Sequence, residues 1–372
     1  MKHRILLVST GGTIAGEVAD NKKDPNYEIK TAENFSDLIK DTILNIKREQ
    51  NIELEIVPRE YGAIDSSDIK PGHWIDLVNI IKQEYDKYDS FIITHGTNTL
   101  GYTSAALSFA LLNNGKRVVL TGSQVPIELP GSDAKTNLDN AIRIACWQKN
   151  EIYGVVTVFG SHIISGTRVK KSTEFDYDAF QSFNTGSIGR IGRIIDINED
   201  NLKKHNSFYI NTKGVHAPHT KNSAQLKIDN RFNANIVSLT EFPGMNPNIF
   251  NTLVTQLGTK GFILRAFGAG DAAHSLGEAL EFLKREKIPI VITTQTPNGN
   301  ANMQVNEPGQ YIKKNELGIP AYDMGIEAQT AKLAWLLAKM GNKDITYKQL
   351  CEQMTHNIRG EIRVMWEDEY LI

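Results

Sequence analysis

Four short loops of this chain are rich in hydroxyl side chains, the groups that bind or attack small polar carbonyl compounds. They are Gly12-Thr13, Asp65-Ser66-Ser67, Gly96-Thr97-Asn98-Thr99 and Thr121-Gly122-Ser123. A threonine hydroxyl becomes a nucleophile only when a base or a neighbouring charge activates it. Backbone N–H groups of glycine-containing loops can stabilise the oxyanion that then forms. Each loop alone reads as a turn or a helix cap. Together they favour attack by a threonine on a small polar carbonyl compound.

The elements before these loops indicate how the loops come together. Apolar runs of strand length, Ile5–Val8, Phe91–Ile93 and Val118–Leu120, each lead into a hydroxyl-rich loop. Helix-like segments alternate with them, one over 100–114 and another starting near Ser132. This alternation predicts βαβ units and a parallel sheet. Ligands of such sheets bind outside the carboxyl ends of the strands, so the loops should share one edge.

The second half of the chain repeats the alternation on a smaller scale. Strands are predicted at 235–240, 262–265 and 289–293, and helices at 276–286, 325–339 and 347–355. Between the halves, residues rich in Asn, Lys, His and Ser interrupt the apolar periodicity. We therefore predict an α/β protein with a larger N-terminal parallel-sheet domain at 1–195, an interdomain connection at 196–230 and a smaller C-terminal α/β domain at 231–372.

The composition of the chain limits the kinds of molecule and compartment that we expect for it. The 372 residues include 41 Lys and Arg against 43 Asp and Glu, a net charge of −2 that suggests neither a nucleic-acid nor a membrane-surface partner. The two cysteines, Cys146 and Cys351, lie far apart, and we expect ordinary thiols rather than a disulfide or a metal pair. The apolar run after Met1 is too short for a signal peptide, and no stretch has the length of a membrane span. We expect a cytoplasmic enzyme or binding protein without a metal.

Two longer motifs carry a resemblance to a known family. Thr10-Gly11-Gly12-Thr13-Ile14-Ala15-Gly16 and Thr94-His95-Gly96-Thr97-Asn98-Thr99 resemble the two signature loops of the bacterial-type L-asparaginases. The segments 65–68, 102–109, 119–124 and 357–361 resemble the type I, cytoplasmic branch of that family. The resemblance runs through nearly the whole chain in order and is poorest over 200–230.

The resemblance implies an amidohydrolase that converts L-asparagine to L-aspartate and ammonia without a cofactor. It implies a homodimer or homotetramer, with each site between the N-terminal domain of one subunit and the C-terminal domain of another. Thr13 matches the nucleophile, and Tyr27 matches the loop tyrosine that assists it and closes over the substrate. Thr97 matches a second threonine, which Lys171 would activate through its ammonium. Ser66 and Ser67 match positions that hold the α-carboxylate and amine of the substrate.

Two site positions depart from the family pattern. Asn98 stands where the family has an aspartate that holds the substrate's ammonium, so a charge-assisted hydrogen bond becomes a neutral one. Asp271 stands where the family has an asparagine, in a loop that a neighbouring subunit brings near the substrate's amine. We hypothesise that the two form a reciprocal exchange, which keeps one amide and one carboxylate near the ammonium. The alternatives are unrelated substitutions in a weak or altered enzyme, and a deliberately inactivated variant.

Other functions remain open at this level. One is the amidase subunit that supplies ammonia for tRNA-dependent amidation, although that protein usually has an extra N-terminal domain and this chain starts at its first strand. Another is an amidase for glutamine or for an amide without an amine. A third is a catalytically weak homologue or sensor that binds asparagine or aspartate without turnover. Four retained residues, Thr13, Tyr27, Thr97 and Lys171, favour catalysis over a sensor.

Overall fold

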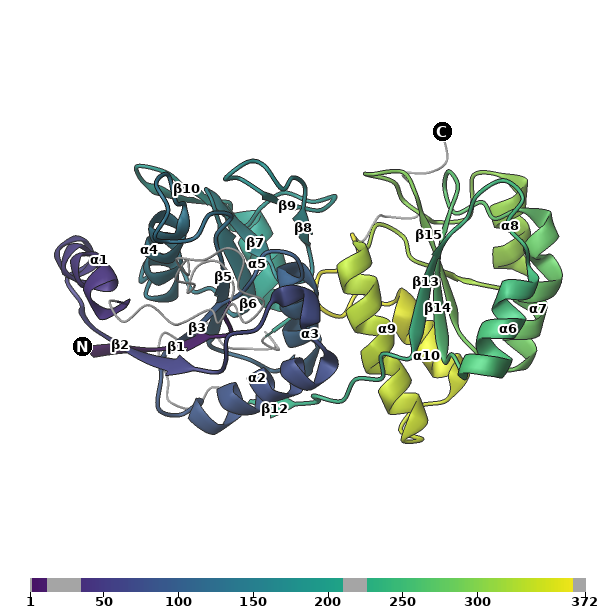
Figure 1. Ribbon diagram of the computed structural model, residues 1–372, viewed down its shortest axis with the longest axis horizontal. Helices are drawn as coiled ribbons and strands as arrows, with labels where there is room; N and C mark the ends of the chain where they lie inside the picture. Colours follow the sequence, from purple (N-terminus) through teal and green to yellow (C-terminus); the bar gives the residue numbers. More distant parts are fainter. Residues whose placement is uncertain (1, 12–34, 210–225, 364–372) are drawn as a thin grey trace, which may run out of the picture. The chain divides into compact units, whose positions relative to one another are not determined.

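The computed structural model of the chain describes residues 2–11, 35–209 and 226–363. The chain forms two compact units. The first comprises Met1–Ser182 and Gly186–Asn230, and the second comprises Phe183–Thr185 and Arg231–Ile372. Each unit has its own parallel-dominated sheet with helices on its faces (Figure 1). The prediction of an α/β fold with a larger parallel sheet and a smaller C-terminal sheet is confirmed.

The described part of the first unit contains an eight-stranded sheet in the order β11-β10-β7-β6-β5-β3-β1-β2. Its parallel strands are β1 (Lys2–Ser9), β2 (Glu53–Glu60), β3 (Ser90–Thr94), β5 (Arg117–Thr121) and β6 (Gly154–Phe159). Three antiparallel strands extend it, namely β7 (His162–Ser165), β10 (Gly189–Ile191) and β11 (Ile195–Ile197). The β3 residues are all buried, as a central parallel strand covered on both faces requires.

The order of the strands reverses next to β1. Strand β1 pairs with β2 on one side and with β3 on the other, so the chain departs from it in both directions. The crevice beyond the carboxyl ends of strands at such a switch point is where ligands of open α/β sheets bind. Thr10 ties the two strand ends together, because its N–H and its hydroxyl both donate to the Thr94 carbonyl oxygen, at 3.2 and 2.9 Å.

Helices cover both faces of this sheet. They are α1 (Phe35–Gln50), α2 (Pro71–Glu84), α3 (Leu100–Ala110), α4 (Ala134–Ala145) and α5 (Glu199–Ser207). Helices α1 and α4 share a core with the sheet side chains on one face, including Ile5, Leu7 and Ile92. Helix α3 is buried on nearly every side, which explains why its sequence lacks a polar face.

The helix predicted over 100–114 ends earlier, at Ala110. Leu111 and Leu112 turn into a short strand, β4 (Leu111–Leu112), which pairs with β12 (Lys227–Ile228). Asn113 follows with φ of 58°, a left-handed conformation that a helix cannot continue through. The described part of 196–230 contains β11, α5 and β12, and these elements group with the first unit.

The second unit contains a four-stranded parallel sheet among its described residues. The strands are β13 (Ile236–Thr240), β14 (Gly261–Ala266), β15 (Ile290–Thr294) and β16 (Ile319–Pro320). The helices are α6 (Asn248–Leu257), α7 (Gly277–Arg285), α8 (Glu307–Lys314), α9 (Ile326–Gly341) and α10 (Tyr347–Thr355). Helices α6 and α7 lie on one face of the sheet and α9 on the other (Figure 1). Strand side chains such as Phe262, Leu264 and Ile292 form the core under α6 and α7.

A buried ion pair fastens the last described segment to helix α9. The side chains of Lys332 and Glu361 are both fully buried, and their charged atoms lie 2.6 Å apart. Lys332 also donates to the carbonyl oxygens of Met354 and His356, and Glu361 accepts from the N–H of Ile358. Both charges are therefore paired and hydrogen-bonded, which offsets much of the cost of burying them.

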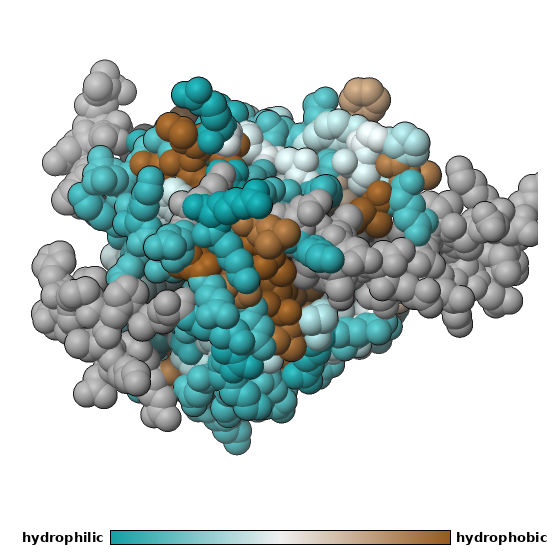
Figure 2. All heavy atoms as spheres, turned by 90° about the vertical axis from the view of Figure 1, so that its left-hand side faces the viewer, coloured by the Kyte–Doolittle hydropathy of each residue, from teal (hydrophilic) through white to brown (hydrophobic). Residues whose placement is uncertain are grey.

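Polar residues cover most of the described surface seen in Figure 2, with bands of apolar residues between them. Exposed apolar side chains of the first unit include Phe175, at 87% exposure, with Tyr177 and Leu129. None of the described helices is long and apolar enough to cross a membrane.

Candidate functional site

The described site is centred on the loop that follows β3. Lys171 lies on β8 (Val169–Lys171), which forms a small hairpin with β9 (Phe180–Ser182). Its ammonium donates to Thr97 Oγ1 at 2.9 Å and to Asn98 Oδ1 at 3.4 Å. Thr97 is 9% exposed, while Asn98 is exposed and Lys171 half-buried. A cation thus reaches a nearly buried hydroxyl at the rim of the switch-point crevice.

A second loop, which follows β2, lies against the first. Asn98 Nδ2 donates to Ser67 Oγ at 3.3 Å, and the Thr99 hydroxyl donates to the Ser66 carbonyl oxygen at 2.6 Å. A short 3₁₀ turn, Ser66–Asp68, carries both serines, and Asp65 caps it by accepting from the Ser67 N–H at 2.8 Å. Both Ser66 and Ser67 are therefore held in place beside the Thr97 loop.

The approach of the two loops depends on Gly96. A Cβ atom at this position would lie 2.6 Å from Ser66 Oγ, closer than side-chain contacts tolerate. Glycine is therefore required for the two hydroxyl-rich loops to meet. Gly122 has the same role in the loop after β5, where a Cβ would lie 2.3 Å from the His95 carbonyl oxygen.

Helix α4 holds the loop after β5. The Asp133 carboxylate accepts from the backbone N–H groups of Gln124 and Val125, each at 3.0 Å. Asn137 donates to the Gly122 carbonyl oxygen and to Asp133, both at 2.9 Å. These bonds fix the Thr121-Gly122-Ser123 loop from behind. Ser123 itself is 1% exposed, so the structure gives it no open route to a ligand among the described residues.

Two titratable side chains next to the Thr97 loop, Lys171 and His95, both have lowered pKa values. Burial lowers the pKa of the Lys171 ammonium below its usual range, and the nearby Glu174 carboxylate opposes that shift. Burial lowers the pKa of His95 to about 4, so its imidazole is neutral near pH 7. His95 is fully buried and cannot touch a substrate. Lys171 is half-buried, and both hydrogen bonds that its ammonium donates to the Thr97 loop run to neutral oxygens, those of Thr97 and Asn98.

The structure brings together five of the residues predicted for the site, which are Ser66, Ser67, Thr97, Asn98 and Lys171. Thr13 and Tyr27 lie outside the described residues.

Asp271 belongs to the second unit, in the loop after β14. Its Oδ2 accepts from Asn306 Nδ2 at 2.7 Å, and its Oδ1 is buried without a hydrogen-bond partner among the described residues.

Three residues that lie directly behind the Thr97 loop were not predicted from the sequence as site residues. They are Trp74, His95 and Thr103, which are linked by hydrogen bonds behind the Thr97 loop. His95 belongs to a signature motif, which was the available signal. Thr103 lies in the segment 102–109, which also carries the family resemblance, but nothing local in the sequence links it or Trp74 to His95, because only the fold brings the three together.

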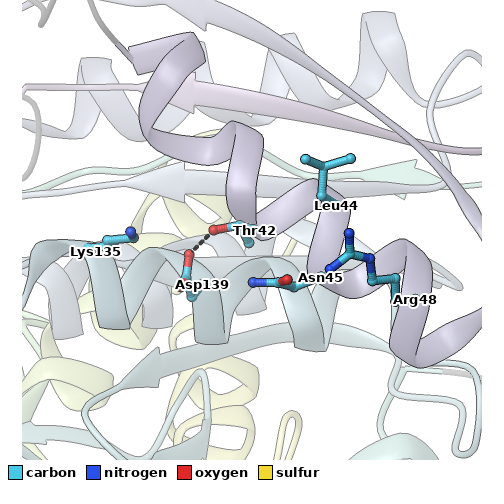
Figure 3. A pocket seen from close by; sticks show the side chains of 6 residues that line it. All are labelled: Thr42, Leu44, Asn45, Arg48, Lys135 and Asp139. Carbon is cyan, nitrogen blue, oxygen red and sulfur yellow. Dashed lines mark hydrogen bonds between the residues drawn. The ribbon is translucent and has the colours of Figure 1, made fainter.

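Within the described residues we find no metal centre, and one further pocket outside the Thr97 loop. No group of three His, Cys, Asp or Glu side chains that could hold a metal ion occurs in the described ranges. A surface pocket of about 310 Å³ lies between helices α1 and α4 (Figure 3), lined by Thr42, Leu44, Asn45, Arg48, Lys135 and Asp139. The Thr42 hydroxyl donates to Asp139 there, and the cationic groups of Arg48 and Lys135 lie at opposite ends of the group drawn. They do not converge on one point, as an anion site would require.

The chain belongs to the asparaginase family and is an amidohydrolase. Residues 4–203 match the family model described as "Asparaginase, N-terminal", and residues 235–349 match "Glutaminase/Asparaginase C-terminal domain". The resemblance noted in the sequence is thereby confirmed.

Named relatives fall into two groups. An L-asparaginase of Thermococcus kodakarensis is 33% identical over 96% of this chain and 99% of its own length. A glutamyl-tRNA(Gln) amidotransferase subunit of Aeropyrum pernix is 30% identical over 97% of this chain and 80% of its own length. Among solved structures, L-asparaginase I of Vibrio cholerae superposes with a TM-score of 0.78, at 30% identity over 98% of this chain and 100% of that one.

Proposed function

We propose that this protein hydrolyses the side-chain amide of L-asparagine to give L-aspartate and ammonia. The single observation that carries the proposal is the contact of Lys171 with Thr97, 2.9 Å from nitrogen to oxygen, at the rim of the switch-point crevice. A binding site has no need of a hydroxyl whose proton a neighbouring amine can take. Membership of the asparaginase family supports the choice of an amide as substrate.

The proton balance of the Thr97–Lys171 pair explains how it would act. With Lys171 as ammonium and Thr97 as hydroxyl, the pair carries one proton too many to serve as a base. Loss of that proton leaves an amine that can accept the Thr97 proton, and the ammonium so formed stabilises the alkoxide. Burial lowers the pKa of Lys171, which eases this loss. Thr97 then activates a water molecule or the substrate.

In the proposed reaction, Thr13 is the nucleophile. Its Oγ forms a bond to the amide carbon while its proton passes, with the assistance of Tyr27, to the amide nitrogen, and the oxyanion then collapses as the C–N bond breaks and ammonia leaves. Water, activated by Thr97, then attacks the resulting ester, which releases L-aspartate and restores the Thr13 hydroxyl. Tyr27 would assist Thr13 and close over the substrate. No cofactor is involved.

Substrate binding is assigned to Ser66, Ser67, Asn98 and Asp271. Ser66 and Ser67 would hold the α-carboxylate and amine, and Asn98 would offer the ammonium a neutral amide oxygen. We further propose that Asp271 of a second copy of the chain supplies the carboxylate that position 98 lacks. In the second unit Asp271 Oδ2 accepts from Asn306 Nδ2 and Oδ1 is buried, so the carboxylate must turn outward to reach a substrate. If Asp271→Asn leaves KM for L-asparagine unchanged, the reciprocal exchange is wrong.

The experiment that tests the proposal is ammonia release from L-asparagine, L-glutamine and succinamic acid, which is asparagine without its amine. We expect faster turnover of L-asparagine than of succinamic acid, because the proposed site binds the α-ammonium group that succinamic acid lacks. Equal turnover of both would mean that the amine contact is lost and that the substrate is another amide. Preference for L-glutamine would redefine the substrate but keep the reaction.

Two rival functions have specific support. The amidotransferase relatives favour an amidase that supplies ammonia to a tRNA-bound substrate; free L-asparagine would then be hydrolysed slowly without a partner protein. The neutral Asn98 favours a weak homologue that binds asparagine or aspartate without turnover. Tight aspartate binding with no ammonia release from any of the three amides would favour this second rival.

Self-association and location also belong to the proposal. Phe175 follows the strand that carries Lys171 and is 87% exposed, and Tyr177, two residues further on, is 53% exposed. We propose that a second copy covers these two side chains in a homodimer or homotetramer. Light scattering of the protein and of its Phe175→Ser variant tests this, and a monomer at all concentrations would refute it. We propose a cytoplasmic location from the resemblance to the type I branch.

A further inference from the structure

A chain of three buried side chains lies directly behind the Thr97 loop. The Trp74 indole N–H donates to Thr103 Oγ1 at 3.1 Å, Thr103 Oγ1 lies 2.9 Å from His95 Nε2, and His95 Nδ1 lies 2.8 Å from the Gly96 carbonyl oxygen. His95 and Thr103 are fully buried and Trp74 is 6% exposed. The proposed reaction uses none of the three.

The partners fix the direction of every hydrogen bond. A carbonyl oxygen only accepts, so His95 must carry its proton on Nδ1 to bind Gly96. His95 Nε2 is then an acceptor, and it takes the only proton of the Thr103 hydroxyl. Thr103 Oγ1 in turn accepts from Trp74, whose indole nitrogen only donates. A neutral histidine in the Nδ1–H tautomer is therefore consistent with all three hydrogen bonds.

These hydrogen-bonded side chains connect two helices to the peptide that precedes Thr97. Trp74 lies on α2 and Thr103 in the first turns of α3, while His95 directly follows β3, where its N–H donates to the Thr121 carbonyl oxygen at 2.8 Å. The Thr103 N–H donates to the Thr99 carbonyl oxygen at 3.1 Å, which closes the other end of the loop. The Gly96 carbonyl is thus held from the interior of the unit rather than by solvent.

We propose that His95 and Thr103 are positioning residues that orient the Gly96–Thr97 peptide so that Thr97 Oγ1 faces Lys171. The inference rests on the proposed role of Thr97. His95 cannot act on a substrate directly, because it is fully buried. Its effect passes through the Gly96 carbonyl oxygen to the next residue, whose hydroxyl must stay within 2.9 Å of the Lys171 nitrogen. Rotation of this peptide would move the hydroxyl off the amine.

The variant Thr103→Val tests the inference with little change in shape. It leaves His95 Nε2 without its donor and removes the hydroxyl that accepts from the Trp74 N–H, so the imidazole keeps its tautomer, set by the Gly96 carbonyl oxygen, but loses the bond that fixes its ring angle from the Nε2 side. Because a misplacement of about 1 Å costs on the order of a hundredfold in rate, we expect kcat for L-asparagine to fall about tenfold to a hundredfold. We expect KM to stay within about twofold, because Thr103 touches no substrate-binding residue.

Two matched variants separate positioning from mere stability. Thr103→Ser keeps the hydroxyl and should restore kcat to within about threefold of the parent protein. Thr157→Val removes another fully buried threonine hydroxyl, which bonds Ser104 at 3.1 Å, without touching His95. It should lower the melting temperature by a similar amount and leave kcat unchanged.

The outcomes are distinct. A low kcat for Thr103→Val alone, rescued by serine, supports the inference. Equal kcat for Thr103→Val and Thr157→Val, with an active parent protein, overturns it. If the parent protein releases no ammonia, the proposed function fails first. If Thr103→Val does not fold, Trp74→Phe removes the indole donor together with part of the buried ring and should lower kcat severalfold, and an unchanged kcat would again overturn the inference.

Discussion

Replacing Asn98 with aspartate adds a negative charge where Lys171 now meets a neutral oxygen. The two atoms concerned are 3.4 Å apart. At that distance, opposite unit charges attract by about 5 kcal/mol at an effective dielectric constant of about 20 and by about 1.2 kcal/mol in bulk water. Lys171 is half-buried and Asn98 exposed, so the effect should lie toward the lower value. We expect the pKa of the Lys171 ammonium to rise by about one to two units, since one unit corresponds to about 1.4 kcal/mol.

The sign of the effect on activity follows from the proton balance. The Thr97–Lys171 pair works after it has lost one proton, so kcat/KM rises as pH rises through the pKa of the pair. A higher pKa moves the acidic limb of the plot of kcat/KM against pH, where kcat/KM rises with pH, to higher pH by the same one to two units. At the same time, the new carboxylate offers a charge-assisted contact to the substrate's ammonium, which should lower KM for L-asparagine about fivefold to thirtyfold.

The assay is ammonia release between pH 5 and pH 10 by the parent protein and Asn98→Asp, with L-asparagine and succinamic acid. The limb should move with both substrates, but KM should fall only with L-asparagine. Asn45→Asp, which makes the same charge change at an exposed position of helix α1, should leave both quantities unchanged. If the limb stays where it is and KM does not change, Asn98 is not next to the working base and the reasoning fails.

Three other predictions concern charged or titratable side chains of the first and second units. Lys171→Met should lower kcat/KM about a hundredfold to ten-thousandfold in the ammonia assay without changing the melting temperature much, and a loss under tenfold would contradict its role as proton acceptor. Glu361→Gln leaves the buried Lys332 charge unpaired and should lower the free energy of unfolding in urea by about 3–5 kcal/mol; a change under 1 kcal/mol would mean that Lys332 is neutral when folded. Burial lowers the pKa of His95 to about 4 and of His205 to about 3, so between pH 6.5 and pH 4 each of these two histidines binds a proton in the unfolded chain but not in the folded one. Each should therefore make the free energy of unfolding fall by up to about 1.4 kcal/mol per pH unit as pH decreases, and His205→Phe should reduce the slope measured in urea denaturation by that amount.

The sequence predicted the sheet and the loops at its edge well, for a physical reason. Central parallel strands are buried on both faces, so Phe91–Ile93 and Val118–Leu120 stand out as apolar runs, and the polar residues after them must lie at the carboxyl edge. The pairing of Thr97 with Lys171 came from the family resemblance. The hairpin that brings Lys171 to Thr97 has strands of three residues, too short to show a periodic pattern.

Other features depended on contacts that no local pattern encodes. Helix α5 begins at an Asn198 cap but buries few side chains, among them Leu202 and His205, so its composition reads as a polar connection. Lys332 occupies one of the buried positions of α9, where only Glu361 and two carbonyl groups make a lysine tolerable. The link between His95 and Thr103 exists only because α3 folds back over the end of β3.

The most direct test of the account is ammonia release from L-asparagine by the parent protein, Thr97→Val and Thr97→Ser. We expect ammonia and L-aspartate in equal amounts from the parent protein. Thr97→Val should lose at least about a hundredfold in kcat, because the Lys171 amine then has no hydroxyl to deprotonate, and Thr97→Ser should retain measurable activity. A parent protein that releases no ammonia, or a Thr97→Val variant as active as the parent, would contradict the account.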